Sequence, residues 1–155
     1  MNHRKVRVAV NGYGVIDKRI ADAVVAQADM ELVGVADVVT DWRIKVAGEK
    51  GYPIYAATPQ ALGELRATGL PVAGALADLL GKVDIVADAT PKQIAAQNLA
   101  RYRAAGVKAI FQGGEKHELT GHSFVAQANY ATALGRHTRR FLQHDQYCAH
   151  TRRLE

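Results

Sequence analysis

Cysteine, aromatic residues and long apolar runs are all scarce in this chain of 155 residues. Its single cysteine, Cys148, excludes an internal disulfide framework and indicates a reducing compartment. The apolar runs are much shorter than a membrane span, and residues 1–5 lead into a strand pattern without the apolar core of a signal peptide. We therefore expect a cytoplasmic globular protein with no membrane partner.

Positive charge is concentrated in residues 136–155, where five arginines and two acids give a net +3 out of the chain's +5. A basic tail is able to attract nucleic acid, but these arginines do not alternate with the aromatic side chains on which single-stranded bases stack. We favour a solvated basic segment and expect no nucleic-acid partner. The salt dependence of nucleic-acid binding would separate the two interpretations.

The same tail contains metal-ligating and apolar side chains. Its histidines are seven and six residues apart, which fits neither helical ligation nor a zinc-finger spacing, so we expect no metal: His137, His144 and His150. Phe141 and Leu142 are predicted to pack on the body of the protein as part of a helix. If the sheet stays partly uncovered, its apolar surface favours a homo-oligomer.

Strand and helix patterns alternate along the chain, which predicts an α/β fold of the Rossmann type, a mostly parallel sheet with helices on both faces. The expected strands are 6–10, 31–36, 53–56, 70–72, 83–88 and 107–112. The expected helices are a short one within 37–51 and those at 15–28, 59–68, 75–80, 92–105 and 123–134.

A glycine turn between the first strand and the first helix is the most informative pattern in the chain. The sequence Asn11-Gly12-Tyr13-Gly14 follows the apolar run 6–10 and precedes a helical pattern. The first glycine of such a turn allows the bend, and the second lets backbone N–H groups approach a pyrophosphate at the positive end of the helix. This context predicts a dinucleotide-binding site.

Asp17 stands where that motif has its third glycine. An acid in the first helical turn interacts favourably with the helix dipole, by roughly 0.3–1 kcal/mol. The same charge repels a pyrophosphate, and its bulk holds the helix away from the strand. We therefore expect weaker cofactor binding than in an Asp17→Gly variant.

Asp37 ends the second strand, 23 residues after Gly14. In dinucleotide-binding folds an acid at this place accepts hydrogen bonds from the ribose diol and repels a 2′-phosphate, which favours NAD over NADP. The alternative is that Asp37 only caps the next turn. Arg43 is close enough in sequence to serve a 2′-phosphate, so NADP stays possible.

Two further segments follow predicted strands, at the edge where open parallel sheets bind their ligands. Residues 88–92 read Asp-Ala-Thr-Pro-Lys and have a helix cap as their alternative interpretation. Residues 112–116 read Gln-Gly-Gly-Glu-Lys and suit close backbone approach to a ligand, although a simple turn, with this segment taken alone, explains them better.

The joint pattern resembles the archaeal-type (type II) phosphorylating glyceraldehyde-3-phosphate dehydrogenases. It comprises NGYGVIDKRIADAV, EKGYPIYA, DATPK with Gln97-Asn98-Leu99, and AIFQGGEK, in that order. The resemblance implies that Gly12, Gly14, Val15 and Ile16 surround the cofactor phosphates. It also implies that Thr90 and Pro91 border the nucleotide and that Gly113 lies near the nicotinamide. The expected cofactor-binding set is Gly12, Tyr13, Gly14, Val15, Ile16, Asp37, Thr90, Pro91, Gln112 and Gly113.

The resemblance extends to about Gly135, which divides the chain into an expected NAD(P)-binding domain, 1–135, and a non-family tail, 136–155. Such enzymes continue with RVVSCNTT, whose cysteine attacks the aldehyde, and Cys148 is not in that motif. Codons for residues 138–145, read one base later, permit the spelling RVVSCNTT. We hypothesise an out-of-frame tail and expect cofactor binding without turnover. The alternative is a folded, cofactor-free, self-associating remnant.

Overall fold

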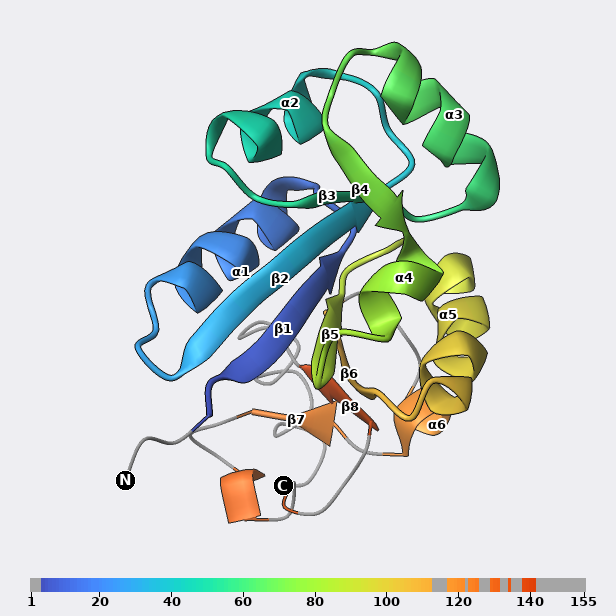
Figure 1. Ribbon diagram of the computed structural model, residues 1–155. Coiled ribbons are helices and arrows are strands. Elements are labelled where there is room, and N and C mark those ends of the chain that lie inside the picture. Colours follow the sequence, from blue (N-terminus) through green and yellow to red (C-terminus); the bar gives the residue numbers. More distant parts are fainter. Residues whose placement is uncertain are drawn as a thin grey trace.

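The computed structural model describes residues 4–112, 117–121, 123–125, 129–131, 134 and 138–141. Within them the chain forms a single sheet with the strand order β4-β3-β2-β1-β5-β6-β8-β7, every pair of neighbours being parallel (Figure 1). The strands are β1 Val6–Asn11, β2 Met30–Asp37, β3 Ile54–Ala56, β4 Val72–Ala75, β5 Ile85–Asp88, β6 Lys108–Phe111, β7 Ser123–Phe124 and β8 Thr138–Phe141. The predicted Rossmann-type α/β fold is confirmed.

Strand β1 lies at the centre of the sheet, between β2 and β5, because its alternating apolar residues are buried on both sides. Val10 and Ala9 are fully buried, and they belong to separate clusters on the two faces. In the register of the sheet, Asn11 is opposite Ala36 of β2 and Asp88 of β5. The carboxyl ends of the three central strands therefore meet at one edge of the sheet.

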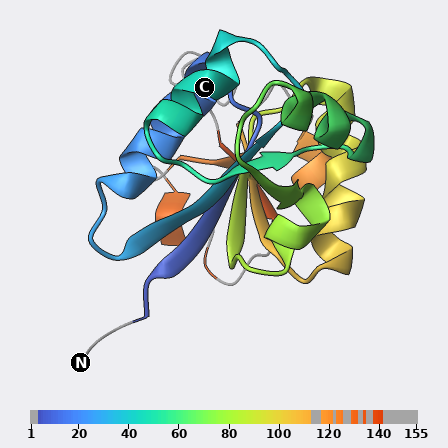
Figure 2. The same ribbon diagram turned by 45° about the horizontal axis from the view of Figure 1, so that its top comes forward.

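Helices cover both faces of the sheet (Figures 1 and 2). They are α1 Val15–Val25, α2 Trp42–Glu49, α3 Pro59–Ala67, α4 Leu76–Leu80, α5 Lys92–Ala104 and α6 His117–Thr120. Buried residues of α1, α2 and α3, such as Ala21, Ile44 and Leu65, pack in one cluster with Val10 and Val35. Buried residues of α4 and α5 pack in the other cluster, on the opposite face, with Ala9 and Phe111.

Local signals explain where the helices begin. Asp41 accepts a hydrogen bond from the Arg43 backbone N–H at the start of α2, and Thr58 accepts one from the Ala61 N–H at the start of α3. Pro59 occupies the first turn of α3, where its missing N–H costs nothing. Helix α1 ends at Val25, three residues earlier than predicted, because the chain has to turn there to enter β2. Just before β2 begins, the Asp29 carbonyl accepts a hydrogen bond from Val6 N–H.

Two predictions for the later part of the chain are wrong. In the helix predicted over 123–134, the start is wrong: Ser123–Phe124 is a strand, β7, because it pairs with β8, whereas residues 129–131 are helical. Phe141 ends β8 and is not helical, since the backbone of 138–141 extends the sheet beside β6. The tail histidines His144 and His150, together with Leu142 and Cys148, lie outside the described residues.

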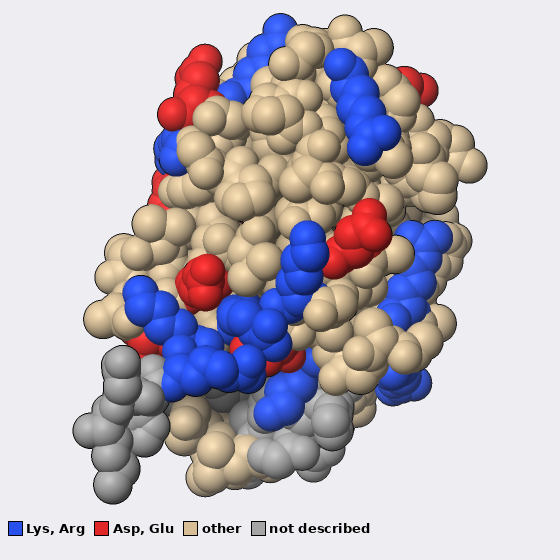
Figure 3. Space-filling model, viewed as in Figure 1, with Lys and Arg blue, Asp and Glu red and all other residues tan. Residues whose placement is uncertain are grey.

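The opposite edge of the sheet, at the amino ends of the strands, carries many of the basic side chains. Figure 3 shows several Lys and Arg side chains gathered in this region. Asp84 lies among them and accepts hydrogen bonds from Arg7 and Arg4, which hold the pKa of its carboxyl group well below the usual range. No helix of the described part of the chain is both long and apolar enough to cross a membrane.

Candidate functional site

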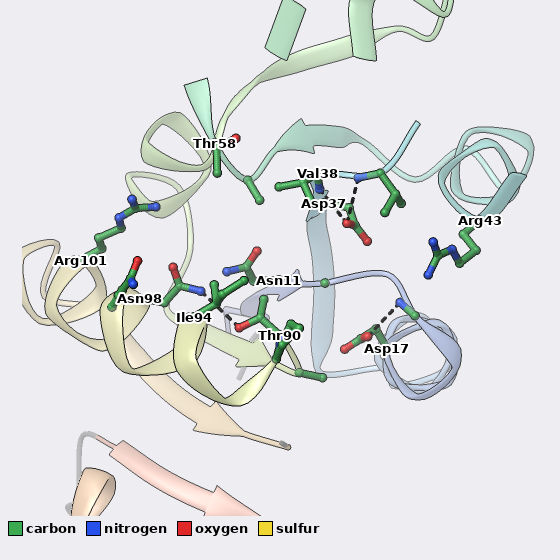
Figure 4. A pocket seen from close by; sticks show the side chains of 17 residues that line it. Asn11, Asp17, Asp37, Val38, Arg43, Thr58, Thr90, Ile94, Asn98 and Arg101 are labelled. Carbon is green, nitrogen blue, oxygen red and sulfur yellow. Dashed lines mark hydrogen bonds between the residues drawn. The ribbon is translucent and has the colours of Figure 1, made fainter. Parts of the chain in front are cut away.

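A pocket of about 440 Å³ opens at the carboxyl ends of the central strands. Open parallel sheets bind ligands at this edge, where the connections after neighbouring strands diverge to opposite faces. The pocket is lined by the turn after β1, the loops after β2, β3 and β5, and one face of α5. Figure 4 shows the polar side chains of these segments directed into a common space.

The glycine turn after β1 forms one wall of the pocket. Gly12 has a φ of 97°, a conformation that favours glycine, and its N–H donates to the Ala36 carbonyl at 2.8 Å. Gly14 is the N-cap of α1, and its N–H donates to Asp17 Oδ2 at 2.9 Å. A helix N-terminus of this kind suits an anion, but here one of its N–H groups already binds the carboxylate of Asp17.

Asp17 is only 3% exposed, and its second oxygen, Oδ1, has no hydrogen-bond partner among the described residues. Burial raises the pKa of this carboxyl group to about 6, with smaller contributions in the same direction from the charges of Asp37 and Asp88. The hydrogen bond from Gly14 N–H opposes this shift. Asp17, which stands at the third position of the motif, is therefore a buried acid within the wall of the pocket.

Asp37 at the end of β2 is held by the backbone around it. Its Oδ2 accepts from Tyr13 N–H at 2.6 Å, and its Oδ1 accepts from Val38 N–H at 2.6 Å and Val39 N–H at 3.1 Å. These bonds tie the loop after β2 to the glycine turn. The predicted capping role of Asp37 is therefore present, and its carboxylate also lines the pocket.

A buried polar network supports the floor of the pocket. Asp88 is fully buried at the end of β5, where its Oδ1 accepts from the Thr90 hydroxyl at 2.6 Å. Its Oδ2 accepts from the Tyr102 hydroxyl at 2.6 Å and from Asn98 Nδ2 at 3.0 Å. The Tyr102 hydroxyl in turn accepts from Asn11 Nδ2, and burial raises the pKa of this phenol. The network thus joins β1, β5 and α5 behind the pocket.

Two arginines line the pocket at its two ends (Figure 4). Arg43 of α2 forms a bidentate contact with Asp41, with Nη2 to Oδ2 at 2.6 Å, so its charge is already paired. Arg101 of α5 has no acidic partner among the ion pairs of the described residues. In Figure 4 the two acids of the pocket, Asp17 and Asp37, lie closer to Arg43 than to Arg101.

The structure brings only part of the predicted cofactor set together. Of the ten residues, those that line the pocket are Gly12, Gly14, Asp37, Thr90 and Pro91. The Tyr13 side chain is fully buried in the core, Val15 and Ile16 are exposed beside the turn, and Gln112 follows β6 outside the pocket lining. Gly113 lies outside the described residues.

Sequence reasoning missed the α5 face of the pocket. Ile94, Gln97, Asn98 and Arg101 all line it, and their spacing of three and four residues is that of one helical face. The helical spacing of these four residues is the sequence signal that could have identified this face of the pocket. The loop residues Val38, Val39, Ala57 and Thr58 also line the pocket, and their positions just after β2 and β3 were the corresponding signal. No group of three metal-ligating side chains occurs among the described residues.

Solved structures first identify the class of fold. The chain is similar to an NAD-binding protein from Listeria innocua, with a TM-score of 0.57 and 20% identity, over 91% of this chain and 35% of that one. It is also similar to GenD2 from gentamicin A biosynthesis in complex with NAD, with a TM-score of 0.51 and 22% identity, over 70% of this chain and 27% of that one. At these identities the likeness establishes the Rossmann-type fold.

Curated relatives then make the resemblance specific. The chain is 54% identical over 132 residues to the glyceraldehyde-3-phosphate dehydrogenase of Thermococcus kodakarensis and 51% identical over 130 residues to that of Methanothermobacter thermautotrophicus. These matches cover 85% and 84% of this chain but only 40% and 39% of the relatives. The expected resemblance to archaeal glyceraldehyde-3-phosphate dehydrogenases is confirmed, and the chain spans about 40% of their length. No family model matches the chain.

Proposed function

We propose that this chain binds a nicotinamide dinucleotide in the pocket at the carboxyl ends of β1, β2 and β5. The observation that carries the proposal is the meeting of the Gly12–Gly14 turn with the backbone-anchored carboxylate of Asp37 in one pocket. The turn suits the pyrophosphate, and the carboxylate suits the ribose diol. The names of the relatives and of the NAD-bound neighbour support the same ligand class.

Within this proposal, NAD is the preferred cofactor. Asp37 presents a negative charge where a 2′-phosphate would lie, and charge repulsion disfavours NADP. Arg43, the cation nearest to this region among the pocket residues, is already paired with Asp41. Calorimetric titration with NAD⁺ and NADP⁺ tests both parts. Tighter NADP⁺ binding would contradict the preference, and binding of neither cofactor would contradict the proposed function.

We propose further that the pocket serves the phosphate-dependent oxidation of glyceraldehyde 3-phosphate, as the cofactor-binding part of a dehydrogenase. We assign no catalytic residue in this chain, because Cys148 is not in the expected RVVSCNTT context. We therefore expect no turnover by this chain alone. Phosphate-dependent production of NADH from glyceraldehyde 3-phosphate would overturn that expectation.

A second candidate is a folded protein that binds no cofactor and self-associates. The carboxylate of Asp17 favours it, because this side chain occupies the Gly14 N–H that a phosphate would need. The exposed apolar side chains Val15, Trp42 and Ile94 lie on elements around the pocket and favour self-association. Light scattering across a wide concentration range, together with the cofactor titration, separates this candidate from the first.

A further inference from the structure

The carboxylate of Asp17 has the same relation to the glycine turn that a bound phosphate would have. Its Oδ2 accepts from Gly14 N–H at 2.9 Å and would lie 3.3 Å from a Cβ built on Gly12. The side chain is anionic, lies at the N-terminus of an 11-residue helix and is 3% exposed. An internal anion therefore already fills this part of the pocket wall.

The buried position of Asp17 is also unfavourable for the charged form of its carboxyl group. Its Oδ1 is buried and has no hydrogen-bond partner in the described part of the chain. A buried carboxylate with one unsatisfied oxygen loses solvation that backbone N–H groups at its other oxygen do not replace. Protonation removes this cost, because a neutral carboxyl group is much less expensive to bury.

Two nearby carboxylates act in the same direction, and the nearby cations are engaged elsewhere. Asp37 on β2 and Asp88 on β5 both disfavour its negative charge. On α2, Arg43 is engaged by Asp41, and on α1 the Lys18 ammonium lies over the Trp42 ring at 4.0 Å. Of the pocket residues on α5, Ile94, Gln97 and Asn98 carry no charge, and Arg101 lies at the end of the pocket away from Asp17 (Figure 4). A dinucleotide would add a pyrophosphate to this acidic surrounding.

We propose that a dinucleotide binds this pocket together with a proton taken up by the Asp17 carboxyl group, whereas a nucleoside without phosphate binds with no proton. This inference rests on the proposed function. Protonation neutralises the internal anion and releases Gly14 N–H for the pyrophosphate. Asp17 thus makes the relative affinity for phosphate-bearing ligands and for adenosine depend on pH.

The size of the effect follows from linkage. With the pKa of Asp17 at about 6, the protonated fraction falls about twentyfold between pH 5.5 and pH 7.5. We expect the affinity of the wild-type chain for NAD⁺ to fall by about the same factor. Binding at pH 7.5 should take up about one proton per NAD⁺, which calorimetry in two buffers of different ionisation enthalpy measures.

The test compares three chains, the wild type, Asp17→Asn and Asp78→Asn. Asparagine at position 17 carries no charge and, like the protonated acid, is a weaker acceptor for Gly14 N–H than a carboxylate, so its NAD⁺ affinity should be independent of pH and should exceed that of the wild type at pH 7.5. Asp78 is the matched control, because it occupies the third position of α4 and accepts from Ala75 N–H at 2.8 Å, outside the pocket lining. The Asp78→Asn variant should behave as the wild type.

Adenosine serves as the control ligand, and its binding is measured from the changes in the backbone amide NMR shifts. Its affinity should be the same for all three chains at both pH values. Circular dichroism confirms that each variant is folded. The inference is overturned if NAD⁺ binds the wild type equally at both pH values without proton uptake, a result that leaves the proposed function intact. If NAD⁺ binds none of the folded chains at either pH, the proposed function fails and the inference fails with it.

Discussion

The hydroxyl group of Tyr102 donates to Asp88 Oδ2 at 2.6 Å while accepting from Asn11 Nδ2 at 2.6 Å. One side chain of α5 therefore joins the ends of β1 and β5 beneath the pocket. Both Tyr102 and Asp88 are fully buried, so water does not replace a lost partner. This connection is the basis of the first prediction.

Replacing Tyr102 with Phe should lower the free energy of unfolding by about 1–3 kcal/mol, because Asn11 Nδ2 and one carboxylate contact of Asp88 lose their partner in a buried place. Urea denaturation measures the change. Tyr52→Phe is the control, since its hydroxyl donates to the partly exposed Asp22 at 2.6 Å and water is available there. Equal losses in the two variants would contradict the role of burial.

The second prediction concerns the stability of the protein as a function of pH. Burial raises the pKa of Asp17 above its usual value, to about 6, so the native state binds more protons than the unfolded state between about pH 4 and pH 6. Stability should therefore fall by about 1–3 kcal/mol as the pH rises through this window. The Asp17→Asn variant should lack this component, which thermal denaturation at several pH values measures. A wild-type profile parallel to that of the variant would contradict the prediction.

The third prediction concerns the close packing of β2 against β3. A Cβ on Gly34 would lie 2.6 Å from Cε2 of the Tyr55 ring, which belongs to the same buried cluster as Leu79. Gly34→Ala should therefore cost about 1–3 kcal/mol of stability, since the ring has to shift. Gly63→Ala is the opposite case, because nothing lies within 4 Å of its Cβ on the exposed side of α3, and it should stabilise by about 0.5–1 kcal/mol. Denaturation curves with the same sign for both variants would refute the argument.

The fourth prediction tests cofactor choice. Asp37→Asn removes the negative charge and keeps one side-chain oxygen, which accepts from the backbone N–H of either Tyr13 or Val38 but not from both. We expect the ratio of NADP⁺ to NAD⁺ affinity to rise about tenfold, equivalent to about 1.4 kcal/mol. Competition titrations measure the ratio, with Asp29→Asn as the control outside the pocket lining. An unchanged ratio would contradict the preference of Asp37 for NAD⁺ and would leave its carboxylate with the capping role alone.

The fifth prediction concerns the coding sequence of the tail. Codons for residues 138–145 permit RVVSCNTT one base later, and degeneracy leaves several of these bases free. We expect the actual coding DNA to spell this motif and to stay open beyond it in the shifted frame. A stop codon directly after the motif, or different bases at the free positions, would refute the out-of-frame origin.

The amino-acid sequence predicted the alternation of strands and helices closely up to residue 112, because these elements are specified locally. Asp41 and Thr58 cap helices, Pro59 suits a first turn, and the successive apolar residues Ala9 and Val10 require burial on both faces of the sheet. The later segment 123–134 was predicted less well. Ser123 and Phe124 form a strand through pairing with β8, a partner more than ten residues away along the chain.

The sequence by itself determined the type of fold, the glycine turn and the presence of acids at positions 17 and 37, because each depends on residues next to one another in the chain. Only the tertiary structure decided what those acids do. It buried Asp17 against Gly14 N–H, tied Asp37 to Tyr13 and brought the α5 side chains of Asn98 and Tyr102 onto Asp88. Burial and hydrogen-bond partners depend on segments distant in sequence, and these set the charge state and the accessibility of the pocket.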